Sequence, residues 1–284
     1  MAIDYETLLN FNIPEVRQTL TKRDAVFYAL SIGLGQDPLD ERQLDFVDQH
    51  RALQVMPSMA VVLCHPGFWL RDPRTGVDAV RLVHGEQGIE WHRPLPVEGE
   101  LVGRTRVTGL VDKGEGRGAL LYSEKQIRDP AGTLYATTRS TTFLRGDGGF
   151  GGPSGRVKAP HPEPQGMPDY VVDLPTRPEQ ALYYRLNGDD NPLHSDPATA
   201  AKARFARPIL HGLCTLGVVT HAILRRLADY RAAALRSLDL RFSSPVFPGE
   251  TIRTEIWRSG AFRARLVERD VIVVNNGFAR VQGG

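Results

Sequence analysis

The sequence carries the same order of features twice, once on each side of a stretch rich in glycine and proline. In each copy a Gly/Asp/Pro loop precedes an apolar run, and a segment with Pro and Gly-Glu follows. Such internal similarity constrains the fold strongly, because both copies must form the same structural unit. We therefore predict an ancient duplication. The matching segments are Tyr28–Asp40, Val55–His65 and Pro94–Val102 in the first half, and Tyr183–His194, Arg207–Val219 and Ser244–Ile252 in the second.

The two copies are separated by residues 146–169, where glycine and proline dominate and no apolar periodicity remains. Gly146, Gly148 and Gly151 formally match the GxGxxG pattern of dinucleotide-binding turns. That motif requires a helix directly after it, and here a proline-rich segment follows. We predict a linker, which divides the chain into an N-terminal repeat of residues 1–145 and a C-terminal repeat of residues 170–284.

Apolar and polar residues alternate in several segments bounded by glycine, aspartate or proline, a pattern typical of antiparallel strands with one buried face. The run Ile209–Leu227 is instead apolar on nearly every side and predicts a buried helix. We expect an α+β fold in which one long helix is wrapped by a curved antiparallel sheet, present twice. The predicted strands are residues 99–111, 118–129 and 132–145 in the first half, and 238–246, 251–260, 262–270 and 271–281 in the second.

Composition and charge limit the classes of partner that we expect for this chain. The 284 residues carry a formal net charge of only +2, so no strong overall field attracts nucleic acid or an anionic membrane. The two cysteines, Cys64 and Cys214, lie in apolar runs without metal-ligand spacing, and we expect them to be buried thiols. The first residues lack the features of a secretory signal, and no apolar run approaches the ~18 residues of a membrane span. We expect a cytoplasmic protein without nucleic-acid or membrane partners.

The segment Gly188–Pro192, followed by His194, has two interpretations. It forms a simple polar turn, since these residue types all suit turns, or it holds Asp189 and His194 as an acid/base pair. Five residues separate the two side chains, about 140° on a regular helix, so a continuous helix could not direct both at one atom. Pro192 interrupts a helix in any case, and an irregular turn can let them converge.

The flanking residues favour the acid/base interpretation. Asp196 and Pro197 have the character of a helix start, which predicts a short helix over residues 198–204 directly after the turn. A carboxylate and an imidazole together can hold and activate a water molecule. The first half has Gly35 and Asp40 where the second has Asp189 and His194, so only one copy is expected to perform chemistry.

The segment GDDNPLH, followed by a buried helix that contains HG, resembles the motif of the MaoC-like, R-specific enoyl-CoA hydratases, the hydratase 2 family. LVHGEQGIEWHRPLPVEGEL and VDKGEGRGALLY in the first half resemble the substrate-binding half of its two-repeat members. The resemblance covers nearly the whole chain and implies a double hot-dog fold. It also implies a catalytic set of Asp189, His194, Asn191 and Gly212, in which Asn191 orients the aspartate and Gly212 N–H binds the thioester oxygen.

The resemblance further implies a set of acyl-CoA contacts. Lys113 suits a CoA phosphate and Phe242 suits an apolar wall, although each also has an ordinary structural explanation. No metal or other cofactor is implied, and the eight histidines include no HxH or HExxH spacing. The implied substrate-binding residues are His84, Gly85, Lys113, Asp190, Pro192, Leu193 and Phe242.

These observations predict reversible hydration of trans-2-enoyl-CoA to (3R)-3-hydroxyacyl-CoA. The first repeat is expected to bind acyl-CoA and to have lost its own chemistry, which leaves room for medium or long acyl chains. We expect a homodimer. The alternatives are a dehydratase acting on acyl-carrier-protein or bulky ring-bearing thioesters, and a non-catalytic acyl-CoA-binding protein.

Overall fold

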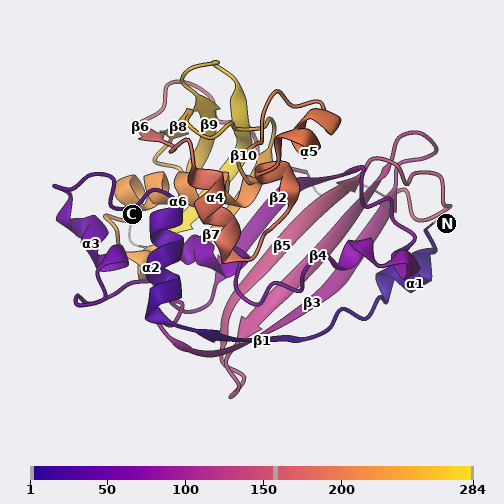
Figure 1. The fold of residues 1–284 in the computed structure, drawn as a ribbon, viewed down its shortest axis with the longest axis horizontal. Coiled ribbons are helices and arrows are strands. Elements are labelled where there is room, and N and C mark those ends of the chain that lie inside the picture. Colours follow the sequence, from indigo (N-terminus) through magenta and orange to yellow (C-terminus); the bar gives the residue numbers. More distant parts are fainter. Residues whose placement is uncertain (1–2, 156–158, 283–284) are drawn as a thin grey trace.

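The computed structural model describes residues 3–155 and 159–282. Its main element is a ten-stranded antiparallel sheet with the order β1-β3-β4-β5-β2-β7-β10-β9-β8-β6 (Figure 1). The strands are β1 (Val16–Leu20), β2 (Leu82–Trp91), β3 (Gly99–Asp112), β4 (Ala119–Arg128), β5 (Leu134–Leu144), β6 (Tyr170–Pro175), β7 (Leu235–Phe242), β8 (Thr251–Ile256), β9 (Ala261–Leu266) and β10 (Ile272–Val281).

The sheet is built from two equivalent halves. Read from its outer edge inwards, each half presents its first, third, fourth, fifth and second strand. The halves meet where β2 pairs with β7, through residues 86–90 and 237–241. The sheets thus join edge to edge, which covers two strand edges that would otherwise be free to pair with another chain. This topology confirms the expected double hot-dog fold.

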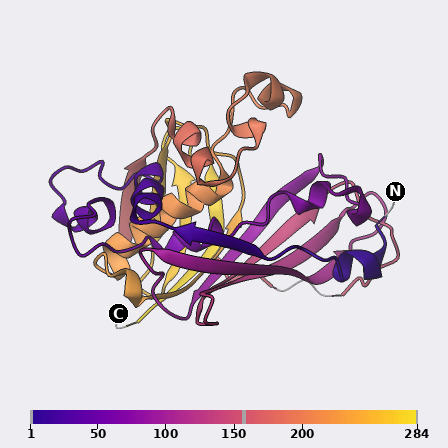
Figure 2. The same cartoon turned by 60° about the horizontal axis from the view of Figure 1, so that its bottom comes forward.

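The helices lie mainly on one face of the sheet, and Figures 1 and 2 show α2, α4 and α6 together on that face. The α-helices are α1 (Tyr5–Leu9), α2 (Lys22–Ser31), α3 (Glu41–Val47), α4 (Gln180–Tyr184), α5 (Pro197–Lys202) and α6 (Gly212–Leu227). The 3-10 turns are η1 (Pro57–Val61), η2 (Trp69–Arg71), η3 (Pro73–Thr75), η4 (Arg185–Asn187), η5 (Pro192–His194) and η6 (Ala232–Ala234).

The long helix α6 is the centre of the core, as its apolar sequence predicts. All residues from Cys214 to Leu224 are buried, and the helix contacts β6, β7, β8 and η1. Gly217 allows close packing at its middle, because an added Cβ would lie 2.5 Å from a side-chain carbon of Ile32. Cys64 and Cys214 are both buried and unpaired, as expected.

The expectation of a long helix in both halves is wrong for the first half. The apolar run Val55–His65 forms only the 3-10 turn η1. Pro57 begins this turn, and Pro66 follows the run before a helix of several turns can develop, because proline disfavours helical geometry in the residue before it. The double hot-dog therefore contains one long helix, contributed by the second half.

A buried lysine supports the turn that replaces the helix. Lys125 on β4 is only 6% exposed, and its Nζ donates hydrogen bonds to the carbonyl oxygens of Val61 and Leu63. Burial lowers the pKa of Lys125 to about 8. The ammonium group thus satisfies carbonyl groups that a longer helix would have paired internally.

The predicted linker contains no helix or strand in residues 146–155 and 159–169, so the GxGxxG match is not followed by a helix. Its first part is fixed to the end of β3, because Gly149 and Gly151 donate their N–H groups to the carboxylate of Asp112 at 2.8 and 2.9 Å. Across the described residues, no helix combines the length and the apolar character that crossing a membrane requires.

Candidate active site

The loop that carries Asp189 and His194 is a sequence of short turns. Gly188 has φ +107° and ends η4 in a left-handed conformation that favours glycine. The side-chain oxygen of Asn191 then accepts a hydrogen bond from Leu193 N–H at 3.1 Å and caps η5. Directly afterwards Asp196 caps α5 through Ala198 and Thr199, which confirms the predicted short helix.

These turns bring Asp189 and His194 together, along with His211. One ligand atom from each of the three side chains lies within 4.8 Å of the others. His194 Nδ1 lies 2.8 Å from the carbonyl oxygen of Ile209. Because a carbonyl can only accept, Nδ1 carries the proton and Nε2 has a free lone pair. Burial lowers the pKa of His194, so the neutral ring predominates at neutral pH.

His211 is a site residue that the sequence analysis missed. It precedes α6, is 1% exposed, and its ring stacks on that of His194 with centroids 3.7 Å apart. Its Nε2 donates to the backbone oxygen of Asp189 at 3.1 Å. Burial and the neighbouring His194 lower the pKa of His211 to about 4. The available signal was the HG pair before the helix, from which only the glycine was assigned.

Gly212 is the first residue of α6. Neither Gly212 nor Leu213 donates its N–H to any described residue. Such free N–H groups at a helix start attract negative charge, and the helix dipole adds to this effect. A Cβ on Gly212 would lie 3.5 Å from the ring of Phe242, an ordinary contact, so the helix start packs directly on this ring.

Phe242 and His84 extend the cluster onto the sheet. Phe242 ends β7, and the ring of His84, near the start of β2, meets it edge-on with centroids 5.1 Å apart. The pairing of β2 with β5 shifts between His84 and Glu86, so Gly85 lies in a bulge that redirects the strand. Burial lowers the pKa of His84 and the charge of Asp189 opposes this, which places both in one electrostatic environment.

Asn191 acts differently from the expectation. Its side chain caps η5, and the contact to Asp189 comes instead from its backbone N–H, 3.3 Å from Asp189 Oδ1. Asp190 and Pro192 are exposed and Leu193 is half-buried. The adjacent carboxylate Asp190 thus faces solvent, whereas Asp189 faces the two histidines.

Lys113 lies apart from this cluster. It follows β3, is exposed, and its Nζ lies 5.1 Å from the ring centroid of Phe143. The lysine is held over an aromatic ring and is available to an anionic group in solution. Its contacts therefore place it on the surface of the first half, with no described contact to Asp189 or His194.

The arrangement contains the groups needed to activate a water molecule and to bind a developing oxyanion. A carboxylate and an imidazole nitrogen with a free lone pair can hold one water molecule and exchange its protons. The free N–H at the start of α6 can bind an oxygen on which negative charge develops. Asp189, His194 and His211 are also the one described set of three residues whose spacing suits a metal ion.

The comparisons with known proteins agree across the whole chain. A model of the MFE-2 hydratase 2 N-terminal domain matches residues 18–146, and one of the MaoC-like domain matches residues 160–277. Over 268 residues the chain is 44% identical to 3-hydroxyacyl-thioester dehydratase Y of Mycobacterium tuberculosis, covering 93% of this chain and 90% of that protein. Over 298 residues it is 39% identical to the peroxisomal enoyl-CoA hydratase 2 of Arabidopsis thaliana, covering 98% and 95%.

Among solved structures, a MaoC-like dehydratase from Phytophthora capsici matches with a TM-score of 0.85 and 34% identity, covering 98% of this chain and 99% of that one. Its likeness extends over both halves of the sheet. With one family domain matched in each half, the chain belongs to the MaoC-like hydratase 2 family.

Proposed function

We propose that the protein catalyses the reversible syn addition of water to trans-2-enoyl-CoA, giving (3R)-3-hydroxyacyl-CoA. The observation that carries the proposal is the convergence of Asp189 with His194, whose Nε2 is free to accept a proton. In hydration these two groups hold and activate the water, whose oxygen bonds to C3 while a proton is delivered to C2. Gly212 N–H stabilises the enolate oxygen that develops at the thioester.

In this proposal the two repeats have different roles. The C-terminal repeat, residues 170–284, supplies the chemistry, and the N-terminal repeat, residues 1–145, binds the acyl-CoA. Lys113 is exposed and suits a CoA phosphate, while His84 and Phe242 form a wall beside Gly212. Asn191 supports the geometry of Asp189 through its backbone N–H and its cap of the turn.

Medium or long acyl chains are the proposed substrates. In the first half the turn η1 stands where the second half has a long helix. An apolar cleft of about 190 Å³ lies beside that turn, with Val55, Pro57, Trp91 and Leu95 in its lining. Within β2, His84 and Trp91 lie roughly 23 Å apart at 3.3 Å per residue, so one strand connects the candidate site with this cleft.

The decisive test is hydration of crotonyl-CoA and longer enoyl-CoA esters, followed by loss of the absorbance of the conjugated thioester. Asp189→Asn should lower kcat by about 10²–10⁴-fold, because the carboxylate is proposed to act as a general acid/base. Asp190→Asn is the matched control, since this exposed neighbour should leave activity within a few-fold. Inactivity of the control alone would move the chemistry to Asp190.

Two further readouts separate the alternatives. A stereospecific dehydrogenase should oxidise the product as the R alcohol, and an S product would contradict the proposed facial selectivity. Tight acyl-CoA binding without turnover would favour a binding protein, and turnover restricted to acyl-carrier-protein or ring-bearing esters would favour the other dehydratases. We also propose a homodimer in the cytoplasm, which light scattering and cell fractionation test.

A further inference from the structure

The segment of residues 209–212, which leads into α6, contacts every group of the proposed reaction. Ile209 contributes its carbonyl oxygen, which accepts the Nδ1 proton of His194 at 2.8 Å. Gly212 carries the N–H that is proposed to bind the thioester oxygen. His211 precedes Gly212 directly and contacts both His194 and Asp189. It is therefore placed to determine how these groups lie relative to one another.

The side chain of His211 holds the main chain of Asp189. Its Nε2 donates to the backbone oxygen of Asp189 at 3.1 Å. A carbonyl oxygen can only accept, so Nε2 carries the single proton of the neutral ring. A second proton would have to lie on Nδ1, which is buried and has no hydrogen-bond partner among the described residues. Since a buried charge without a partner is strongly unfavourable, the ring stays neutral and Nε2 remains a fixed donor.

The ring of His211 also supports the ring of His194. The two rings stack with their centroids 3.7 Å apart and an angle of 27° between their planes. The buried ring of Tyr184 packs against His211 as well, with centroids 5.0 Å apart. The backbone of His211 is fixed too, because its carbonyl oxygen accepts the N–H groups of Cys214 and Thr215 at 3.1 Å in the first turn of α6. His194 thus stacks on a residue that is held by the helix.

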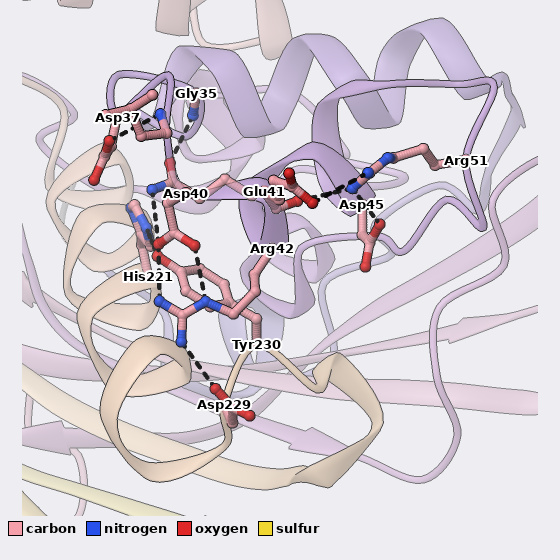
Figure 3. A network of polar contacts seen from close by, with 12 residues as sticks. Gly35, Asp37, Asp40, Glu41, Arg42, Asp45, Arg51, His221, Asp229 and Tyr230 are labelled. Atoms are coloured by element: carbon pink, nitrogen blue, oxygen red, sulfur yellow. Dashed lines mark hydrogen bonds and ion pairs between the residues drawn. The ribbon is translucent and has the colours of Figure 1, made fainter.

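The equivalent loop of the first half, residues 32–40, is held in a different way. It follows Ser31, whose hydroxyl donates to the backbone oxygen three residues earlier, as the side chain of Asn187 does before the second-half loop. Arg42 Nε and Nη2 bind the two carboxylate oxygens of Asp40 at 2.8 and 3.0 Å (Figure 3). The carboxylate of the first-half loop is therefore occupied by the contact that fixes it.

The second-half loop keeps its carboxylate available. The contact from His211 uses the backbone oxygen of Asp189, and among the described residues the carboxylate accepts only the N–H of Asn191, at 3.3 Å. Arg42 lowers the pKa of the Asp40 carboxyl, which makes that group a poorer proton acceptor. A neutral N–H on the main chain fixes Asp189 without this effect.

We propose that His211 is a positioning residue for the proposed hydration reaction. Its Nε2–H sets the place of Asp189, its ring sets that of His194, and its peptide bond ties both to the oxyanion donor of Gly212. The role rests on the proposed function, because it concerns the same reaction. His211 does not touch the substrate, since only 1% of it is exposed. Its loss should therefore lower kcat and leave KM unchanged, as misplacement of a catalytic group by about 1 Å can lower the rate about 10²-fold.

Two variants of the full chain, His211→Gln and His211→Met, test the hydrogen bond. The two new side chains have the same length and neither has a ring, but only the amide of glutamine can donate to the carbonyl of Asp189. In enoyl-CoA hydration His211→Met should have a kcat about tenfold below that of His211→Gln, the loss of one hydrogen bond. Equal kcat values in the two variants, or a changed KM with the wild-type kcat, would overturn the proposal. His211→Phe is a second variant without the donor, and wild-type turnover in it would do the same.

His221→Met is the matched control. His221 is a buried histidine of the same helix, and its Nε2 lies 2.8 Å from Tyr230 Oη, away from the catalytic loop (Figure 3). This variant should lower the midpoint of thermal unfolding, because a buried hydrogen bond is lost, while kcat stays at the wild-type value. A loss of kcat as large as that of His211→Met would show that both variants act through the stability of α6, which would refute the positioning role.

A measurement without turnover separates this role from the proposed reaction. The ¹³C resonance of the Asp189 backbone carbonyl reports its hydrogen bond, so it should move in His211→Met and stay closer to the wild-type position in His211→Gln. Absence of hydration by the wild type would contradict the proposed function alone. An Asp189 carbonyl resonance that does not move in His211→Met would contradict the positioning role, whatever the reaction.

Discussion

Replacement of Gly212 by proline isolates the proposed oxyanion donor. Proline lacks the backbone N–H, and it is favoured at the first position of a helix, where Gly212 lies. Proline also requires an extended residue before it, and His211 already has φ −59° and ψ 136°. Since Gly212 N–H has no partner in the described chain, no structural hydrogen bond is lost. The Gly212→Pro variant should therefore fold.

The expected loss follows from the role of the group. Removing one oxyanion-hole donor typically costs about 10²–10³-fold in kcat, or roughly 2.7–4 kcal/mol of transition-state stabilisation. Gly212→Ala is the control, because it retains the N–H and its Cβ makes only an ordinary contact, 3.5 Å from Phe242. The alanine variant should keep turnover within a few-fold of the wild type.

Initial rates of enoyl-CoA hydration measure the difference, with circular dichroism and thermal unfolding to check the fold. Binding of free CoA, which has no thioester carbonyl, should be unchanged in both variants. If the folded proline variant turns over within about tenfold of the alanine variant, Gly212 N–H does not stabilise the transition state. The donor would then have to be another group near the helix start.

Three other outcomes follow from the same structure. Lys113→Ala should raise KM for CoA esters by about tenfold with little change in kcat, and pantetheine esters, which lack the CoA phosphates, should show no effect. A chain ending near Gly146 should be insoluble or self-associating, because it exposes the edge of β2 that pairs with β7, and sharp NMR spectra from both separate halves would contradict this. The free energy of unfolding, from chemical denaturation, should fall as pH decreases from about 6.5 to about 4, because His211 and His221 have native pKa values of about 4 and the unfolded chain binds more protons in that window.

The sheet could be predicted largely because its signal is local. Seven of the ten strands fall within predicted segments or overlap them closely, since alternation of apolar and polar residues reports one buried face directly. The edge strands β1 and β6 and the central strand β2 were missed. The two edge strands alternate in burial but are only five and six residues long, which is too short for a distinct sequence signal, whereas the ten residues of β2 do not alternate regularly.

The first-half helix shows where repetition misleads. An apolar run at the position of α6 predicts a helix, but Pro66 follows the run before a long helix can form, and Lys125 from a distant strand satisfies the resulting carbonyl groups. Conversely, the sequence analysis predicted no helix at α2, although Thr21 and Asp24 form a capping box, which marks a helix start in sequence. Local signals were sufficient for α2, whereas the loss of the first-half helix required tertiary information.

The residues of the candidate site also differ in whether local sequence or tertiary structure reveals them. Asp189 and His194 could be identified because turn chemistry and the residues beside them lie within one short segment. The contact of His84 with Phe242 joins strands from the two halves, and the stacking of His211 on His194 joins a loop to a helix start. Those contacts arise only when the chain folds, so single-sequence reasoning named His84, Phe242 and His194 but neither His211 nor the arrangement of the four rings.

The asymmetry of the repeats has a physical basis in their fusion. Two identical subunits around a twofold axis must carry identical sites, whereas two fused copies can change independently. Asp40 in the first half is held by Arg42, which lowers the pKa of its carboxyl to about 2 and makes it a poor proton acceptor. The carboxylate instead holds Arg42, which joins the halves by donating to Asp229. Helix α6 supports the catalytic loop at its N-terminal end, where His211 donates to the backbone oxygen of Asp189, and it contacts the start of the first-half loop through Cys214 Sγ, which lies 3.7 Å from the backbone oxygen of Ser31.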